Sequence, residues 1–595
     1  MEQTVIYFFW KNVKEKGNRL ALMTKEAGRW REIPFREFGD IVTALASSLL
    51  DMGIHKGDKV AIISQTRYEW TLSDTSILTL GAATVPIYPT VKEDEVKYIL
   101  ANSDSRLAFV EDKGQLQKVL KIKSDLPLLD KIVIFDPKGA PSDSAVVSFA
   151  TFLEQGRSEA AQFAPVILEH AAKIAMDDLA TIVYTSGTTG LPKGGMISHK
   201  NIMFNLRALG SLVETLQEDR AVAYLPLSHV YERINEFNAL YRGTAYCFAE
   251  SIDKMVENLA DIQPAVMPGV PRVYEKMYTR VTEQIQAGPP LKRAIFNWAQ
   301  SVGKRAIPYR MEGRPMPIGL KIQLALANGL VFKKIKDKFG GKLRYCISAA
   351  APISQEVIEF FLSLDIPMYE GFGMTETMAP TSLNTPTASK LGTVGRVFPG
   401  VEVKIAPDGE ILLKGDNVIS GYYKLPEETA ETFADGWLHT GDLGEIDKDG
   451  FLKITGRKKE LIITSGAKHV APNKLENIFS LNPFIGQFVP YGDNRKFISA
   501  IVSLEQEAIE PWATQQGIKY SSFAELSQYP KVRELIQGII EEGNKQLAQF
   551  ETIKKFIVSD HPFSIDTGEL TPTLKVKKKV VYERYMPQLD DLYRE

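Results

Sequence analysis

Ten residues, 184–193, restrict the fold and the chemistry of this chain more than any other stretch. They read YTSGTTGLPK, with two glycines, four small hydroxyl side chains and one lysine, and an apolar run at 181–183 leads into them. Such a run is typical of the end of a buried strand. Glycines let backbone N–H groups approach an anion closely, and the hydroxyls and the lysine add further donors. The stretch therefore predicts a polyphosphate-binding loop at the end of a strand.

Two other interpretations of this loop are less favoured. It is not a Walker A loop, because counting from Gly187 the position that needs glycine holds Pro192. A flexible Ser/Thr/Gly linker is the plainer alternative. A linker has little use for one fixed lysine or for the strand before it, so phosphate binding is the better prediction.

Bulk composition limits the classes of protein to which the chain can belong. A length of 595 residues exceeds one hydrophobic core, so we expect at least two domains. Hydrophobic residues make up 44% and charged residues 24%, as in ordinary soluble proteins, and the net charge of −2 gives no overall attraction to nucleic acid or acidic lipid. The two cysteines, Cys247 and Cys346, lie in apolar runs and are predicted to be buried free thiols. The first ten residues are too short for a membrane span and lack a cleavage site, so we expect a cytoplasmic protein.

Strand-like and helix-like patterns alternate through the first part of the chain. This order predicts an α/β fold in which helices cover both faces of mostly parallel, doubly wound sheets. Such sheets bind ligands at the carboxyl ends of their strands, which is where the 184–193 loop is expected. The predicted helices are 35–52, 94–102 and 200–212. Residues 57–63 are predicted to be a turn that leads into a buried strand, and further strands are predicted at 82–88, 106–110 and 131–135.

A second glycine-rich motif, YEGFGMTET at residues 369–377, follows a predicted strand at 366–368. It places an aromatic ring, two glycines, a hydroxyl and a carboxylate within nine residues. Phe372 could stack on a purine, while Thr375 and Glu376 could face phosphate and a metal ion. Mg²⁺ prefers hard oxygen ligands together with phosphates, so one glutamate near a hydroxyl-rich loop suffices. The simpler alternative is a glycine-rich turn.

The region from about 395 to 456 predicts a small, β-barrel-like subdomain of short strands divided by Pro-Asp-Gly and Lys-Asp-Gly turns. Within it, WLHTGD at residues 437–442 is predicted to be a turn ending in an acid. Asp442 could accept both hydroxyls of a ribose, or it could cap the turn. The last 130 or so residues have the pattern of a compact α+β domain.

Two further features are ambiguous in the sequence. His229 lies beside apolar residues, where a histidine is more often structural than functional. Residues 292–344 hold thirteen Lys or Arg against only Glu312 and Asp337. This segment is either a solvated helical face or a surface for anionic lipid or CoA phosphates, and its basicity favours neither.

Taken together, the motifs resemble those of the AMP-forming (adenylate-forming) acyl-CoA synthetase superfamily. The resemblance rests on the 184–193 loop with its GGMISH continuation, on the 369–377 motif and on the sequence ITGRKKELIITSG at 454–466. LSHVYER at 227–233 and PGVPRVYEKM at 268–277 resemble the long-chain fatty acid–CoA ligase group in particular. The likeness covers nearly the whole chain.

The resemblance implies a role for each matching residue. ATP and AMP binding is implied for Thr185, Ser186, Gly187, Thr188, Thr189, Gly190, Lys193, Glu370, Gly371, Phe372, Gly373, Thr375, Asp442 and Arg457. Catalytic roles are implied for Lys575, Glu376, Thr185 and Lys193, and metal binding for Thr185 and Glu376. An acyl pocket is implied at His229, Val230, Ala349 and Ala350, although relatives have an aromatic residue at 229 and commonly glycine at 349. Lys459 is the implied hinge, Gly466 the implied CoA path, and Lys575 the adenylation lysine, with residues 577–579 as alternatives.

As a whole, the resemblance implies a long-chain fatty acid–CoA ligase that uses Mg²⁺, ATP and CoA. An N-terminal adenylation domain (1–457) and a smaller, mobile C-terminal domain (458–595) are expected, with rotation between the two half-reactions. The substrates would be a fatty acid, ATP and CoA, without nucleic acid; peripheral contact with an anionic membrane and an oligomer both stay open. The alternatives are an acyl-AMP ligase loading a carrier protein, a medium-chain or aryl acid–CoA ligase, and a lipid-binding scaffold without activity.

Overall fold

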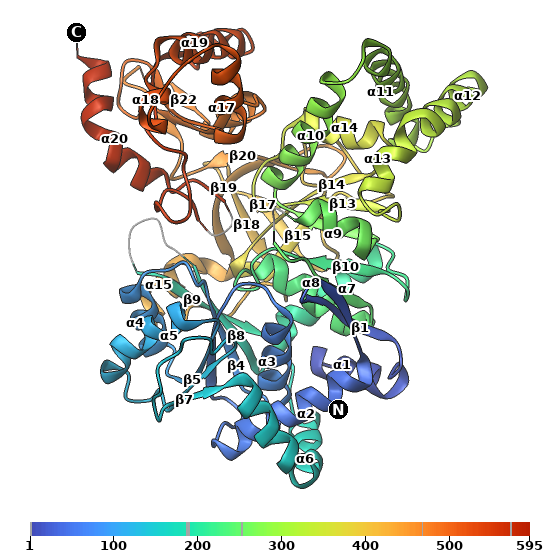
Figure 1. Ribbon diagram of the computed structural model, residues 1–595, viewed down its shortest axis with the longest axis vertical. Coiled ribbons are helices and arrows are strands. Elements are labelled where there is room, and N and C mark those ends of the chain that lie inside the picture. Colours follow the sequence, from blue (N-terminus) through green and yellow to red (C-terminus); the bar gives the residue numbers. More distant parts are fainter. Residues whose placement is uncertain (1–2, 186–190, 252–253, 467, 572–573, 595) are drawn as a thin grey trace.

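The computed structural model describes residues 3–185, 191–251, 254–466, 468–571 and 574–594. Two large sheets form the body of the molecule, together with a smaller sheet and a C-terminal lobe, which lies at the upper left of Figure 1. The first sheet has the spatial order β7 (Val146–Ser148), β6 (Lys131–Ile134), β5 (Ser105–Val110), β3 (Lys59–Ile63), β4 (Ala83–Ile87), β8 (Leu179–Thr185) and β9 (Lys193–Ser198).

Helices cover both faces of this sheet, as the α/β pattern predicts. Side chains alternate along β3, so Val60 and Ile62 join one apolar core while Ala61 and Ile63 join another. The helices of the first core are α2 (Phe35–Asp51), α3 (Tyr68–Thr79) and α6 (Phe149–Ala172), and those of the second are α4 (Glu93–Asn102) and α5 (Lys113–Ile122). The doubly wound arrangement is thereby confirmed. Strands β3 to β8 pair in parallel, and only β9 runs antiparallel, at the edge.

The second sheet is parallel at its centre and antiparallel at both edges. Its spatial order is β16 (Arg396–Val397), β15 (Ala379–Leu383), β14 (Met368–Met374), β13 (Tyr345–Ser348), β12 (Val266–Gly269), β10 (Arg220–Ala223), β11 (Ala245–Phe248), β1 (Leu20–Glu26) and β2 (Arg29–Pro34). The helices of this part are α1 (Val5–Glu15), α7 (His199–Leu212), α8 (Val230–Arg242), α9 (Met255–Ile262), α10 (Pro271–Gln286), α11 (Pro290–Met311), α12 (Ile318–Ala327), α13 (Lys333–Lys338) and α14 (Gln355–Ser363). A π-helical segment, η2 (Asn328–Phe332), joins α12 to α13.

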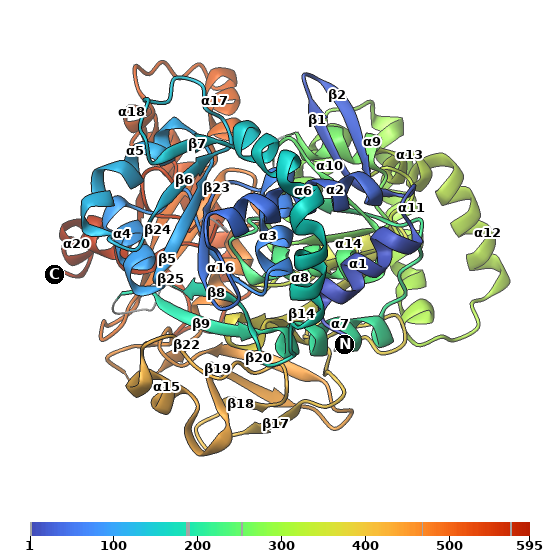
Figure 2. The same ribbon diagram turned by 90° about the horizontal axis from the view of Figure 1, so that it is seen from below.

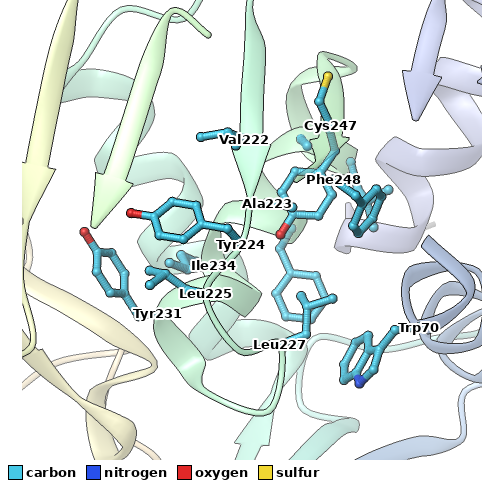
Figure 3. Packing of buried hydrophobic residues seen from close by; sticks show 14 of the residues in the cluster. Trp70, Val222, Ala223, Tyr224, Leu225, Leu227, Tyr231, Ile234, Cys247 and Phe248 are labelled. Atoms are coloured by element: carbon cyan, nitrogen blue, oxygen red, sulfur yellow. The ribbon is translucent and has the colours of Figure 1, made fainter. Parts of the chain in front are cut away.

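The core between these sheets is dense and apolar. Figure 3 shows side chains from β10, β11 and α8 packed together, with Trp70 of α3 reaching the same cluster. Cys247 lies in this core, and both it and Cys346 are buried free thiols, as predicted.

The small subdomain is an antiparallel meander of β17 (Glu402–Ile405), β18 (Glu410–Lys414), β19 (Leu438–Ile446) and β20 (Leu452–Arg457), with α15 (Pro426–Thr432) beside it. Its order places β17 and β20 at opposite edges, so the expected barrel-like unit is an open sheet. The turn predicted at 437–442 is wrong, because these residues begin β19 and Asp442 pairs with Arg457 on β20. Gly441, at a φ of +71°, supplies the bend within the strand. Likewise, β14 continues through the 369–374 motif instead of ending before it.

The C-terminal lobe has apolar cores of its own and an α+β pattern, as predicted. Its strands are β21 (Ile462–Ile463), β22 (His469–Val470), β23 (Ile485–Tyr491), β24 (Ile498–Leu504) and β25 (Ile553–Val558). Its helices are α16 (Pro472–Phe479), α17 (Gln506–Gln515), α18 (Phe523–Ser527), α19 (Pro530–Asn544) and α20 (Lys578–Tyr593). Among the described helices of the whole chain, none combines the length and the apolar character that crossing a bilayer requires.

Candidate active site

A cavity of 2890 Å³ lies where the two large sheets, the small subdomain and the C-terminal lobe meet. Strands β8, β13 and β14 reach it with their carboxyl ends, the position at which α/β sheets bind ligands. The meander and the C-terminal lobe supply its other walls, so one cavity collects residues from distant parts of the chain. Predicted site residues on its surface are Thr185, Lys193, His229, Val230, Ala349, Ala350, Glu370, Gly371, Phe372, Gly373, Thr375, Glu376, Asp442, Arg457, Lys459 and Lys575.

The two ends of the first motif lie on paired antiparallel strands, since Thr185 ends β8 and Lys193 begins β9. Thr185 and Lys193 are paired across the two strands and both border the cavity. The Lys193 ammonium lies 5.3 Å from the centroid of the Tyr422 ring, within range of a cation–π contact. The predicted nucleotide-binding residues Ser186, Gly187, Thr188, Thr189 and Gly190 lie outside the described residues. The described ends of the hairpin thus place a hydroxyl and an ammonium at the carboxyl edge of the sheet.

Glu376 of the second motif is held by a residue that the sequence did not single out. The Tyr422 hydroxyl donates a 2.6 Å hydrogen bond to Glu376 Oε1, and both side chains are buried. Tyr422 is brought there because its segment pairs with the exposed edge of β9, at Gly195. The second motif itself is tightly folded, since a Cβ at Gly373 would overlap the Ala379 carbonyl. The carboxylate is therefore fixed on the side of the cavity that the β8–β9 hairpin also borders.

Asp442 and Arg457 form an ion pair across β19 and β20, the last two strands of the meander. Arg457 Nε donates to Asp442 Oδ1 at 2.9 Å, and its guanidinium also lies 3.8 Å from Glu460. Burial raises the pKa of the Asp442 carboxyl, while Arg457 opposes that change. Asp442 Oδ1 is thus engaged, and the carboxylate has a fixed orientation at the cavity wall.

Lys575 reaches this part of the cavity from the C-terminal lobe. A turn holds its backbone, in which the Thr571 N–H donates to the Lys575 carbonyl at 2.7 Å. Its ammonium acts electrostatically on His229, Asp442 and Arg457, all of which belong to the first 457 residues. Lys575 borders the cavity and keeps solvent-exposed surface, yet the surrounding protein and then Arg457 lower its pKa to about 8.

The neighbouring lysines face other groups. Lys578 pairs with Glu460 and Glu476 at 2.9 Å each, and Lys579 lies 3.9 Å from Glu583 on its own helix. Lys577 is exposed and acts on Glu95. Asp442 and Arg457 act electrostatically on Lys575, whereas Lys578 is acted on by Glu460 and Glu476.

We expect the rate of acyl-AMP formation to fall as pH rises through about 8, the lowered pKa of Lys575. The pKa is below its ordinary value, so the ammonium is present below this pH and is lost above it. Measuring kcat/KM for ATP in the absence of CoA isolates this step. Lys575→Arg is the control, because a guanidinium does not titrate in this range, and its remaining activity should lack the alkaline decline. The same decline in Lys575→Arg would show that another group causes it.

The predicted acyl-pocket residues, His229, Val230, Ala349 and Ala350, also border the cavity. His229 caps α8, where its Nδ1 accepts a 3.1 Å hydrogen bond from the Tyr231 N–H. Burial and the Lys575 charge lower the pKa of His229 to about 3, so the ring is neutral. His229 therefore has a structural role as well as a place on the cavity wall. Ala350 has a φ of +74°, a conformation that favours glycine, and it turns the chain after β13 so that Ala349 borders the cavity.

Lys459 and Gly466 occupy different positions relative to the cavity. Lys459 lies in the turn directly after β20, between the meander and the C-terminal lobe. Gly466 is exposed and is not among the described residues that line the cavity. In this arrangement the C-terminal lobe presents Lys575 to the cavity and holds Gly466 outside it.

Some cavity residues gave no signal in the sequence. Tyr422 lies in a loop without periodicity. Its position depends on pairing with Gly195 of β9, which lies 227 residues earlier in the chain. Glu370 was predicted, but its state was not: burial raises its pKa to about 8, so it carries a proton at neutral pH. The described residues hold no group of three or more His, Cys, Asp or Glu placed to bind a metal ion.

Comparisons with known proteins agree with this geometry. The model of the AMP-binding enzyme family matches residues 9–423, and that of the AMP-binding enzyme C-terminal domain matches residues 459–595. The long-chain-fatty-acid–CoA ligase FadD15 of Mycobacterium bovis is 34% identical, over 95% of this chain and 93% of its own. The peroxisomal long chain acyl-CoA synthetase 6 of Arabidopsis thaliana is 33% identical, over 96% of this chain and 82% of its own.

Solved structures share the fold at lower identity. The anthranilate CoA ligase AuaEII, in complex with anthranoyl-AMP, has a TM-score of 0.75 at 19% identity and covers 99% of this chain and 98% of its own. The o-succinylbenzoate CoA synthetase of Bacillus subtilis, in complex with its acyl-adenylate intermediate, has a TM-score of 0.67 at 20% identity, over 98% of both chains. At these identities the likeness shows the fold.

Proposed function

Because this chain belongs to the AMP-binding enzyme family, we propose that it is a long-chain fatty acid–CoA ligase. It joins a fatty acid to CoA at the expense of ATP and releases AMP and pyrophosphate. The observation that carries the proposal is the convergence of Glu376, the Asp442–Arg457 pair and Lys575 on one cavity. A scaffold that only binds lipid would have no use for this set of charged groups together.

The first half-reaction forms an acyl-adenylate. A carboxylate oxygen of the fatty acid attacks the α-phosphorus of ATP, and pyrophosphate leaves with the electron pair of the broken P–O bond. The chain needs to orient the reactants and stabilise charge, and it supplies no nucleophile. Lys193 and Lys575 provide cations for the phosphates, Phe372 provides a ring for adenine, and Asp442 accepts from the ribose hydroxyls.

Mg²⁺ fits the residues present at the phosphate side of the cavity. Glu376 offers a carboxylate whose Oε2 is not engaged by Tyr422, and Thr185 offers a hydroxyl, both hard oxygen donors. One carboxylate suffices when a nucleotide supplies phosphate ligands. These two residues would hold the ion, which would supply charge neutralisation at the phosphates when bound.

The second half-reaction forms the thioester. The CoA sulfur, as a thiolate, attacks the acyl carbonyl carbon of the adenylate, and AMP leaves with the electron pair of the C–O bond. We propose that the C-terminal domain, residues 458–595, turns about Lys459 against the N-terminal domain, residues 1–457, to bring Gly466 to the cavity. A glycine leaves space for the narrow pantetheine chain. The turn after β20 is the position where such a rotation requires few changes of backbone angles.

Long-chain acids should be the preferred substrates. Each buried methylene contributes about 0.8 kcal/mol, so kcat/KM should rise by at least about a hundredfold between acetate and palmitate. A panel of acids from acetate to arachidate, assayed by pyrophosphate release with CoA present, measures this. Benzoate is the control for an aryl acid ligase. A maximum at benzoate or at a medium-chain acid would contradict the assignment to the long-chain group.

For location, we propose a cytoplasmic protein that makes peripheral contact with the inner face of an anionic membrane. The basic segment 292–344 supports this contact by its charge.

A further inference from the structure

The extension formed by α11, α12, η2 and α13 exposes an unusual concentration of large apolar side chains. Fourteen such side chains are exposed in the described part of the chain, and six of them fall between residues 291 and 330. Those six are Leu291, Trp298, Ile318, Ile322, Leu326 and Leu330. Single exposed apolar residues are normal, but a cluster of this kind marks an interaction surface.

Four of these side chains form a stripe, which we call the α12 face: Ile318, Ile322, Leu326 and Leu330. They recur every four residues along α12 and η2 and are between 53% and 77% exposed. Residues four apart lie on one side of a helix. The other side packs inward through Leu324, Ala327 and Phe332. The extension is thus anchored by one side and presents the other to its surroundings.

The basic residues of the extension divide into two groups. Seven make ion pairs or side-chain hydrogen bonds, either within the extension or with neighbouring elements: Lys304, Arg305, Arg310, Arg314, Lys336, Lys338 and Arg344. The other six have no ion-pair or hydrogen-bond partner among the described residues: Lys292, Arg293, Lys321, Lys333, Lys334 and Lys342. No acidic residue occurs between positions 313 and 336. The α12 face is therefore accompanied by Lys321, Lys333 and Lys334 as unpaired cations.

The position of α12 leaves this face accessible. In both views α12 is at the outer margin of the molecule, away from the C-terminal lobe (Figures 1 and 2). With ten residues α12 is about 15 Å long, roughly half the thickness of the hydrocarbon core of a bilayer. A helix of this size and pattern is suited to lie in the plane of a lipid surface.

We propose that the α12 face inserts into the interface of an anionic lipid bilayer, with Lys321, Lys333 and Lys334 against the lipid phosphates. Charge distinguishes this occupant from a second copy of the chain. A symmetric contact between two copies would bring the same unpaired cations together, whereas anionic lipid neutralises them. The four apolar side chains also exclude a free phosphate as the sole ligand. The inference rests on the proposed function in one respect: a ligase for long-chain fatty acids would find its substrate in bilayers.

Vesicle sedimentation of the full chain tests this without catalysis. The wild type should bind vesicles of phosphatidylcholine with phosphatidylglycerol, and bind less as salt rises, because salt screens the lysines. Ile322→Glu/Leu326→Glu should weaken binding by at least about tenfold. Lys333→Ala/Lys334→Ala should weaken binding and flatten its salt dependence. The matched control is Val166→Glu/Leu168→Glu on α6, whose side chains are 40% and 51% exposed, and it should bind as the wild type does.

Each alternative outcome has a distinct meaning. Wild-type binding by Ile322→Glu/Leu326→Glu, or an equal loss in the α6 control, would overturn the proposal. The α12 face would be assigned to a second copy of the chain by a different result: the wild type is a dimer, Ile322→Glu/Leu326→Glu is a monomer, and neither protein binds vesicles. Pyrophosphate release with octanoate, without vesicles, checks that each variant is folded and should not change. If the proposed function failed, no acid would release pyrophosphate even from the wild type, while the vesicle result would stand.

Discussion

We expect Lys575→Ala to slow acyl-AMP formation by at least about a hundredfold while leaving thioester formation from supplied acyl-AMP and CoA nearly unchanged. In the present orientation of the C-terminal lobe the ammonium interacts electrostatically with Asp442 and Arg457. Under the proposed function, charge develops on the α-phosphate at this place during adenylation. After rotation of the lobe the Lys575 ammonium would no longer lie beside Asp442 and Arg457. Pyrophosphate release without CoA measures the first half-reaction, and acyl-CoA formation from palmitoyl-AMP measures the second.

Two variants accompany this experiment. Lys577→Ala removes an exposed lysine two residues away and should affect neither half-reaction by more than a few fold. Gly466→Leu should show the reverse pattern, making acyl-AMP and failing to transfer it. A leucine is accommodated in the present orientation, since a Cβ at Gly466 has only Thr464 Oγ1 within 4 Å, at 3.9 Å. Equal damage to both half-reactions by Lys575→Ala and Gly466→Leu would contradict the alternating orientations. A loss of acyl-AMP formation in Lys577→Ala, with normal formation in Lys575→Ala, would make Lys577 the adenylation lysine.

Glu376→Gln should also reduce acyl-AMP formation by at least about a hundredfold. The substitution keeps the shape of the side chain and its hydrogen bond with Tyr422, and it removes the charge of a buried carboxylate at the cavity wall. Pyrophosphate release across a Mg²⁺ titration is the measurement.

Tyr422→Phe is the matched comparison for this variant. It deletes the hydroxyl that orients Glu376 and keeps the charge, so it should cost less than Glu376→Gln and should raise the Mg²⁺ concentration required. Near-normal pyrophosphate release from Glu376→Gln would remove this residue from the phosphate site.

The elements whose sequence carries a strong local signal were predicted well. The helix expected at 35–52 is α2 (Phe35–Asp51), and the strand expected before the first motif is β8. The spacing of apolar residues predicts both elements, because the helix and the strand each bury apolar side chains in a core. Asp442 shows the limit of such patterns. Residues 437–442 were predicted to form a turn that ends at Asp442, but the pairing of β19 with β20 keeps this residue in a strand.

Features that depend on distant contacts could not be predicted. The hydrogen bond between Tyr422 and Glu376 depends on a loop that pairs with β9, and no local pattern of residues encodes that pairing. The α12 face has a regular apolar spacing, which by itself predicts a buried helix side. Only the packed position of α12 shows that its apolar side is the outer one. The sequence of the basic segment 292–344 likewise does not show which of its Lys and Arg side chains have partners and which are unpaired.

One single-turnover measurement on the wild type tests the central claim most directly. Enzyme mixed with palmitate, ATP and Mg²⁺ in the absence of CoA should release pyrophosphate and accumulate palmitoyl-AMP, and later addition of CoA should convert that adenylate to palmitoyl-CoA with release of AMP. Pyrophosphate release followed by no transfer to CoA would indicate a ligase that loads a carrier protein. No palmitate-dependent pyrophosphate release would contradict the account and leave a lipid-binding protein without this activity.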